Sequence, residues 1–216
     1  MEPRHSKRRI MIDIIKAHAE QVRMWRNENR KFREALFGCL LQLKPKYCLE
    51  IGTHLGQSTE VFQKYFDEHE PDGVVVTVDI HKYKELDLKN AKQLIVHPHV
   101  DNSSDWHYVK NEELLDHNVD SVAKNLPESK FDFCFLDGDH QRDSVIKDFA
   151  IARNLLKEPQ YILFDDTEDD GGGHDSVKVY EEIVAEEKYN VYDFSKEWDV
   201  YCGCALIWNK KTPPTQ

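Results

Sequence analysis

The sequence lacks an apolar run long enough to cross a membrane, and basic residues are fewer than acidic ones. No stretch of its 216 residues approaches the roughly 18 uninterrupted apolar residues that a spanning helix needs. Lys and Arg total 29 against 40 Asp and Glu, which gives a net charge of −11. Nucleic acids and anionic membranes are bound by Lys and Arg that neutralise phosphate. We therefore expect neither a nucleic acid nor a membrane as partner.

Cysteine is also sparse. The five cysteines are odd in number and most of them lie within apolar runs, which does not suit a framework of disulfides. Buried free thiols are typical of proteins from a reducing compartment, so we expect a cytoplasmic location. With 40% hydrophobic residues, the chain has enough apolar side chains for one folded domain.

Charge is distributed unevenly along the chain. Residues 1–34 carry ten Lys and Arg against five Asp and Glu, whereas residues 160–200 carry three Lys against thirteen acidic residues. Apolar residues recur at helical spacing over residues 10–43, and Pro45 follows. We therefore predict an N-terminal helical extension over residues 1–45. Its basic helices are candidates either to cap a binding site or to form a homodimer interface.

The middle of the chain alternates between strand-like and helix-like segments. Strands are predicted at residues 47–51, 74–78, 131–136 and 161–164, with a third strand of the sheet at either 94–96 or 106–109. Helices are predicted at residues 58–68, with Ser58 as N-cap, and at 144–156 and 177–188. This alternation indicates an α/β fold with a mainly parallel sheet covered on both faces.

The end of the chain departs from this alternation. Two further strands, at residues 190–194 and 200–208, have no helix between them and are expected to pair antiparallel at one edge. The core domain is therefore predicted over residues 46–210, followed by a disordered tail over 211–216.

Acidic residues stand at the ends of four predicted strands. They are Glu50, Asp79, Asp137 with Asp139, and Asp165 with Asp166. In an open parallel sheet, ligands bind beyond the carboxyl ends of the strands. Any one of these carboxylates is compatible with an ordinary strand end that faces water, but four at the same edge indicate a site.

The loop after the first strand narrows the choice of ligand. Its glycines, Gly52 and Gly56, are separated by three residues, whereas a dinucleotide-binding turn has only one residue between its first two glycines. The carboxylate of Glu50 would repel a diphosphate and attract a cationic ligand, and Asp79 is placed to bind the hydroxyls of a ribose. The loop suits S-adenosylmethionine better than NAD, although a dinucleotide-dependent oxidoreductase remains an alternative.

These residues also resemble a known family. The run from Glu50 to Ser58, Val78-Asp79, and Phe135-Leu136-Asp137-Gly138-Asp139-His140 resemble class I S-adenosylmethionine-dependent methyltransferases. The closest branch is that of the macrocin-type and cephalosporin-cluster O-methyltransferases, related more distantly to catechol O-methyltransferase. The resemblance implies a Rossmann-like, doubly wound sheet of seven strands in the order 3-2-1-4-5-7-6, with the last strand antiparallel.

The resemblance also implies which residues bind the cofactor. These are Glu50, Gly52, Thr53, Gly56, Ser58 and Asp79, together with an adenine-contacting segment at Asp120 and Ser121. Asp101-Asn102-Ser103 competes for the role of the adenine-contacting segment.

A divalent cation and a general base follow from the same resemblance. It implies that Asp137, Asp165 and Asp166 bind Mg²⁺ or another divalent cation, and that His140 is the base. Mg²⁺ prefers such hard oxygen ligands, and a histidine with an ordinary pKa of about 6.5 suits proton removal at neutral pH. The implied activity, with Asp137 and His140 in the catalytic site, is metal-dependent O-methylation of a small-molecule hydroxyl.

Three alternatives stay open at this point. The carboxylates are also compatible with a solvated acidic loop, and the chain with a catalytically silent scaffold that keeps a cofactor pocket. The acidic, Gly-rich segment at residues 168–174 is interpreted either as a substrate lid or as a flexible loop.

Overall fold

The computed structural model describes residues 31–79, 129–169, 171, 174–195 and 202–210, and the backbone of residues 91–97 and 107–108. Several predictions lie outside these residues: most of the N-terminal extension, both candidate adenine segments at 101–103 and 120–121, and the tail at 211–216. No helix in the described part of the chain combines the length and the apolar character needed to cross a membrane.

Helices and strands alternate as the sequence predicts. The helices are α2 (Lys31–Leu43), α3 (Gln57–His69), α5 (Arg142–Leu155) and α6 (Asp175–Ala185). The strands are β1 (Tyr47–Ile51), β2 (Val74–Asp79), β3 (Ala91–His97), β4 (His107–Tyr108), β5 (Phe131–Leu136), β6 (Leu156–Asp165), β7 (Tyr189–Asp193) and β8 (Cys204–Asn209). Both places proposed for the third strand are therefore strands.

One mixed sheet joins all these strands. Their order is β4-β3-β2-β1-β5-β6-β8-β7. The pairs β1–β2, β1–β5, β2–β3 and β5–β6 are parallel, whereas β8 is antiparallel to both β6 and β7. The predicted α/β class, with a mainly parallel sheet and an antiparallel pair at its end, is confirmed. The sheet has eight strands rather than seven, because the two-residue β4 pairs with β3 at the other edge.

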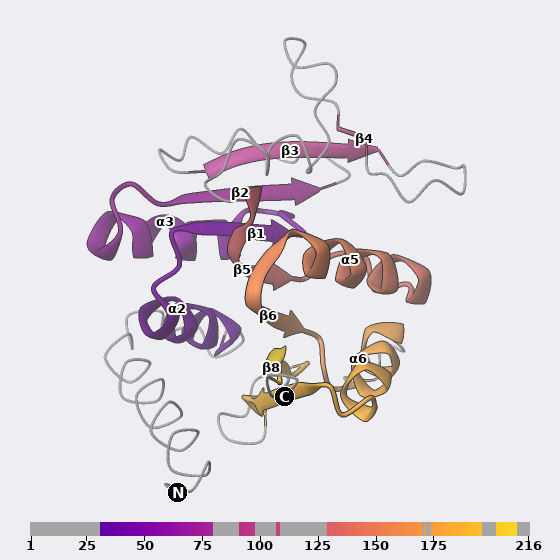
Figure 1. Cartoon of the computed structure of the whole chain (residues 1–216). Coiled ribbons are helices and arrows are strands. Elements are labelled where there is room, and N and C mark those ends of the chain that lie inside the picture. The colour runs from indigo at the N-terminus through magenta and orange to yellow at the C-terminus, as the bar shows by residue number, and fades with distance from the viewer. Residues whose placement is uncertain are drawn as a thin grey trace, which may run out of the picture.

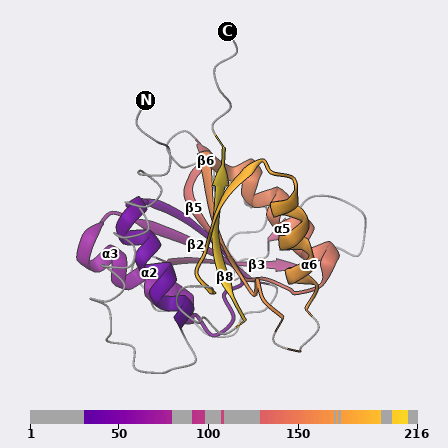
Figure 2. The same cartoon turned by 90° about the horizontal axis from the view of Figure 1, so that it is seen from below.

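Helices cover both faces of the sheet, with α2 and α3 on one side and α5 and α6 on the other (Figures 1 and 2). Successive side chains of a strand point to opposite faces, so each central strand needs apolar residues throughout. In β1, Cys48 packs in the core under α2 and α3, whereas Leu49 and Ile51 pack in the core under α5 and α6. The two cores hold the central strands in place, so that the strand ends and the side chains on them lie together at one edge of the sheet.

The start of α3 differs from the prediction. Its N-cap is Gly56, with a left-handed φ of 75°, and not Ser58. The Gly56 N–H donates to the Thr53 carbonyl at 2.7 Å, and the Gly56 carbonyl accepts from the Glu60 N–H at 2.9 Å. Because glycine adopts a left-handed φ without steric cost, the loop turns into the helix two residues earlier, and Ser58 is buried in the first turn.

All five cysteines are free thiols. Cys39, Cys48, Cys134 and Cys204 are buried, and only Cys202 is half-buried. Burial raises the pKa of the Cys48, Cys134 and Cys204 thiols well above its usual range. The prediction of buried free thiols is confirmed for four of the five, and these four are unreactive core residues.

Candidate functional site

The glycine loop after β1 touches the end of β5 through Gly52. This residue has φ 99°, and a Cβ added to it would lie 1.7 Å from the Asp137 carbonyl oxygen. The Gly52 N–H donates to the Val78 carbonyl, and the Asp137 N–H donates to the Ile51 carbonyl, both at 2.8 Å. Only glycine fits here, and its close approach places the glycine loop directly beside the Asp137 loop.

Glu50 is a buried carboxylate beneath this loop. Its side chain is fully buried, and its Oε2 accepts a hydrogen bond from the Thr59 hydroxyl of α3 at 2.6 Å. Burial raises the pKa of Glu50 to about 7, against hydrogen bonds from Ser58, Thr59 and Thr77 that lower it. Its other oxygen, Oε1, is buried and makes no hydrogen bond to the described residues. A buried carboxylate oxygen of this kind favours a polar or cationic ligand nearby.

The remaining residues of the glycine loop hold one another in place. The Asp79 carboxylate, at the end of β2, accepts from the His54 N–H at 2.7 Å. The Thr53 and Thr77 hydroxyls lie 2.5 Å apart in the buried interior. The structure therefore brings the predicted cofactor residues on β1, β2 and the loop into one assembly.

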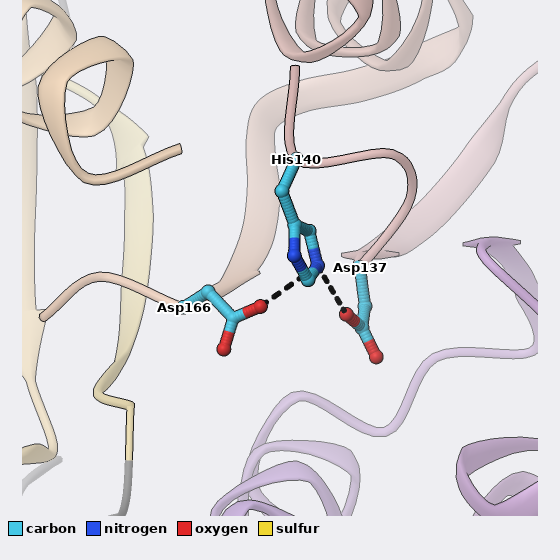
Figure 3. A group of neighbouring side chains, drawn as sticks. All are labelled: Asp137, His140 and Asp166. Carbon is cyan, nitrogen blue, oxygen red and sulfur yellow. Dashed lines mark ion pairs between the residues drawn. The ribbon is translucent and has the colours of Figure 1, made fainter. Parts of the chain in front are cut away.

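A second group lies beside it, at the ends of β5 and β6 (Figure 3). The His140 Nε2 atom lies 2.8 Å from Asp166 Oδ2 and 3.8 Å from Asp137 Oδ1. One ligand atom from each of these three residues lies within 4.8 Å of the others, close enough for all three to hold one metal ion. We call Asp137, His140 and Asp166 the acidic cluster.

Asp165 does not belong to the acidic cluster, although the sequence predicts it as a metal ligand. It is the last residue of β6 and lies opposite Cys204 of β8 in the sheet. Asp166 leaves the strand with φ 53°, a left-handed value uncommon for a residue with a side chain. Its carboxylate points toward His140 (Figure 3), so the turn after β6 presents one of the two neighbouring aspartates.

Burial and charge interactions shift pKa values within the acidic cluster and the pKa of Asp165 beside it. Burial and the nearby charge of Asp166 raise the pKa of Asp137 to about 6. Burial and the charges of Asp137 and Asp166 raise the pKa of Asp165 well above its usual range. Hydrogen bonds to Asp137 and Asp166 raise the pKa of His140 to about 10. At neutral pH His140 is therefore an imidazolium that partly balances the carboxylates, a role that a divalent cation would fill more completely.

A second histidine joins the acidic cluster and was missed by sequence reasoning, which gave a functional context to His140 alone. His174 is the N-cap of α6, and its Nδ1 lies 3.0 Å from His140 Nδ1. The two rings meet edge to face, with centroids 4.4 Å apart and an interplanar angle of 88°. The available signal was its position, at the end of the acidic loop and before a helix that follows the fifth predicted strand.

A protein-family comparison matches this site and its fold. The model of the family described as "Methyltransferase domain" matches residues 49–167, more than half of the chain. The chain belongs to this methyltransferase family. The matched region runs from β1 to the turn after β6, so it contains the glycine loop and the whole acidic cluster.

Solved structures share the fold of this methyltransferase domain. SAH-bound PaMTH1 from Podospora anserina is 16% identical, with a TM-score of 0.52 over 98% of this chain and 99% of that one. The O-methyltransferase from Bacillus cereus in complex with SAH is 18% identical, with a TM-score of 0.53 over 97% and 93%. TomG from Streptomyces achromogenes, an O-methyltransferase solved with SAM, is 15% identical, with a TM-score of 0.53 over 93% and 89%. At these identities the likeness shows the fold.

A viral protein matches a shorter part of the chain. It is the uncharacterized protein R132 of Acanthamoeba polyphaga mimivirus, 33% identical over 82 residues. The match covers 37% of this methyltransferase and 37% of the viral protein.

Proposed function

We propose that this methyltransferase transfers a methyl group from S-adenosylmethionine to a hydroxyl of a small molecule, with the help of a divalent cation. The observation that carries the proposal is the position of the acidic cluster directly beside the glycine loop, through the contact of Gly52 with Asp137. Within the family, the resemblance of the Asp137–His140 segment favours the macrocin-type and cephalosporin-cluster branch.

The glycine loop fits S-adenosylmethionine, which supplies the methyl group on a positively charged sulfonium. Glu50 provides a buried negative charge with one oxygen still without a hydrogen bond in the described structure. Gly52 and Gly56 both have positive φ and carry no side chain that would keep a ligand away from the backbone. Asp79, held by the His54 N–H, is placed to accept hydrogen bonds from ribose hydroxyls.

The acidic cluster fits a divalent cation. Asp137 and Asp166 would hold it, with Asp165 next to them, and the donor set of carboxylate oxygens suits Mg²⁺. When bound, the cation supplies positive charge that lowers the pKa of an acceptor hydroxyl. His140 would be the general base: if a cation neutralised the carboxylates, the cause of the raised His140 pKa would be removed, and its Nε2 could take up the hydroxyl proton.

The residues of the chain contribute orientation and electrostatics. The glycine loop fixes the methyl donor on β1 and β2, and the loops after β5 and β6 fix the base. Because neighbouring strands carry the two halves, the acceptor oxygen and the methyl group would be held close together.

Calorimetric titration with S-adenosylmethionine, with and without Mg²⁺, tests the proposal. We expect binding of the cofactor in both conditions, and a separate heat of Mg²⁺ binding. Turnover is then measured as transfer of a labelled methyl group to a panel of small hydroxyl compounds. Absence of cofactor binding in both conditions would contradict the proposal.

Two rival functions are distinguished by simple measurements. The family match favours methyl transfer over a dinucleotide-dependent oxidoreductase, for which a fluorescence titration with NADH should show binding. A catalytically silent scaffold predicts that His140→Ala leaves function intact. We expect His140→Ala to bind S-adenosylmethionine as the wild type does and to lose methyl transfer.

A further inference from the structure

The contact between His140 and His174 gives the proposed base a defined partner. The two Nδ1 atoms are 3.0 Å apart, which is the distance of an N–H···N hydrogen bond. The opposite ring nitrogen of His140, Nε2, faces Asp166 at 2.8 Å and Asp137 at 3.8 Å. One ring nitrogen of His140 therefore faces the acidic cluster, and the other faces His174 at the start of α6.

We propose that His174 is a positioning residue that fixes the orientation of the His140 ring. Its Nδ1 meets His140 Nδ1 at 3.0 Å, and this contact turns the other ring nitrogen of His140, Nε2, toward the acidic cluster. The role rests on the proposed methyl transfer, in which His140 is the base.

The geometry supports this role. A histidine ring is oriented by the partner that one of its nitrogens meets, and this partner therefore fixes where the other nitrogen points. Without a partner at Nδ1, the His140 ring could turn about its side-chain bonds, and Nε2 would no longer be held facing Asp137 and Asp166.

The backbone holds His174 where this contact requires it. The N–H of Asp175, the next residue, donates to the His140 carbonyl at 3.2 Å. Further along α6, Glu182 forms a two-pronged ion pair with Arg142 in the first turn of α5, at 2.9 and 2.6 Å. These contacts join the start of α6 to the loop that carries His140. The contact between the rings is therefore part of the packing of α6 on α5.

Nuclear magnetic resonance tests the hydrogen bond directly, without any substrate. In protein labelled with ¹⁵N-histidine, we expect a scalar coupling across the hydrogen bond between the Nδ1 nuclei of His140 and His174. The coupling should disappear in His174→Ala. Its absence in the wild type would overturn the proposed contact, whether or not the protein proves to be a methyltransferase.

A matched pair of variants tests the functional role. The amide oxygen of Asn lies where Nδ1 of a histidine lies, whereas the amide oxygen of Gln reaches the position of Nε2. His174→Asn should therefore keep a polar atom beside His140 Nδ1 and retain most of the turnover. His174→Gln and His174→Ala should lower kcat roughly 10- to 100-fold, as removal of a supporting hydrogen bond does elsewhere, with little change in the KM for S-adenosylmethionine.

The outcomes separate this proposal from the proposed function. Equal turnover in His174→Asn and His174→Gln would show that His174 is only structural and would overturn its positioning role. Wild-type protein that binds no S-adenosylmethionine would contradict the methyltransferase proposal and leave the coupling experiment interpretable. If His174→Ala does not fold, the comparison of the Asn and Gln variants still decides.

Discussion

The two halves of the site lie at the same edge of one sheet but are stabilised differently. In the glycine-loop half, polar groups pair through short hydrogen bonds, such as Thr59 with Glu50 at 2.6 Å and the His54 N–H with Asp79 at 2.7 Å. In the acidic cluster, burial and the charge of Asp166 raise the pKa of Asp137 to about 6, and hydrogen bonds to Asp137 and Asp166 raise that of His140 to about 10. The first half is organised by the fold alone, whereas the second depends on the balance of its charges.

The comparison shows two ways of preparing a site. Hydrogen bonds from hydroxyl and backbone N–H groups to well-placed acceptors fix a shape before the ligand arrives. Carboxylates at neighbouring strand ends repel one another, so a bound cation would stabilise them. Mutations in the two halves should therefore be detected by different measurements. The predictions below run from the largest expected effect to the smallest.

The largest effect is expected where the halves touch. Gly52→Ala places a Cβ 1.7 Å from the Asp137 carbonyl at φ 99°, and it should lower the free energy of unfolding by about 3 kcal/mol or more. Gly171→Ala is the matched control, because Gly171 has φ 88° but no atom within 4 Å of its added Cβ. It should cost only about 1–2 kcal/mol. Urea denaturation measures both, and equal losses would contradict the role assigned to the contact.

Removal of one charge should affect the acidic cluster alone. Asp137→Asn takes away a candidate cation ligand and one cause of the raised pKa of His140. We expect Mg²⁺ affinity to fall by at least about tenfold and the pKa of His140 to drop below about 10, with S-adenosylmethionine affinity unchanged. Calorimetry and histidine pH titration by NMR measure these quantities.

Asp139→Asn is the control for Asp137→Asn. Asp139 lies in the same loop but accepts hydrogen bonds from the Gln141 N–H and the Ser144 hydroxyl at the start of α5. It should leave Mg²⁺ binding as it is. Equal loss of Mg²⁺ affinity in both variants would mean that overall charge, and not the acidic cluster, binds the cation.

In the glycine-loop half, burial destabilises the ionised form of Glu50. Its pKa is raised from 4.5 to about 7 in the folded protein, so the folded state binds the proton more tightly than the unfolded state. Ionisation therefore costs stability as the pH rises from 4.5 to 7, and the full cost remains above 7. Glu50→Gln should raise the free energy of unfolding at pH 8, by at most about 3 kcal/mol.

This gain should shrink toward zero as the pH falls to about 4.5, which urea denaturation across the pH range will show. The same variant should weaken S-adenosylmethionine binding, since the buried negative charge is gone. Glu60→Gln, an exposed change on α3, the helix whose Thr59 donates to Glu50, should show neither effect. A gain from Glu50→Gln that does not vary with pH would contradict the assigned cause.

The smallest effect concerns a single neutral hydrogen bond. Thr53→Val removes a partner of the buried Thr77 hydroxyl and should lower the free energy of unfolding by about 1 kcal/mol. The double variant Thr53→Val, Thr77→Val should lose less than the sum of the two single losses, because neither hydroxyl of the pair is then left without the other. Mg²⁺ affinity should stay unchanged in both. If the double variant loses the sum of two single losses, the two hydroxyls do not depend on each other.

Local sequence was sufficient where a pattern determines an element. The β-branched run at Val74–Val78 and the aromatic run at Phe131–Leu136 predict strands buried on both faces, and both are central strands of the sheet. The spacing of Gly52 and Gly56 predicts a tight loop with a nearby backbone, and both glycines have positive φ. These features depend on neighbours within a few residues.

Features that depend on distant contacts were not predictable in this way. His174 lies 34 residues from His140 in the chain, and only the packing of α6 against α5 brings their rings together. Asp165 and Asp166 are indistinguishable as letters, but the left-handed turn at Asp166 selects which of them reaches His140. Ser58 has the right chemistry for an N-cap and is displaced from that role by the conformation of Gly56.

The backbone bonds at the strand ends have one more consequence. The bonds from the Gly52 N–H to Val78 and from the Asp137 N–H to Ile51 extend the ladder of the sheet past β1, β2 and β5. The spacing between the two loops is therefore set by main-chain hydrogen bonds and not by side chains. For the proposed methyl transfer, the distance between the methyl donor and the base would therefore not depend on the side chains that contact the acceptor.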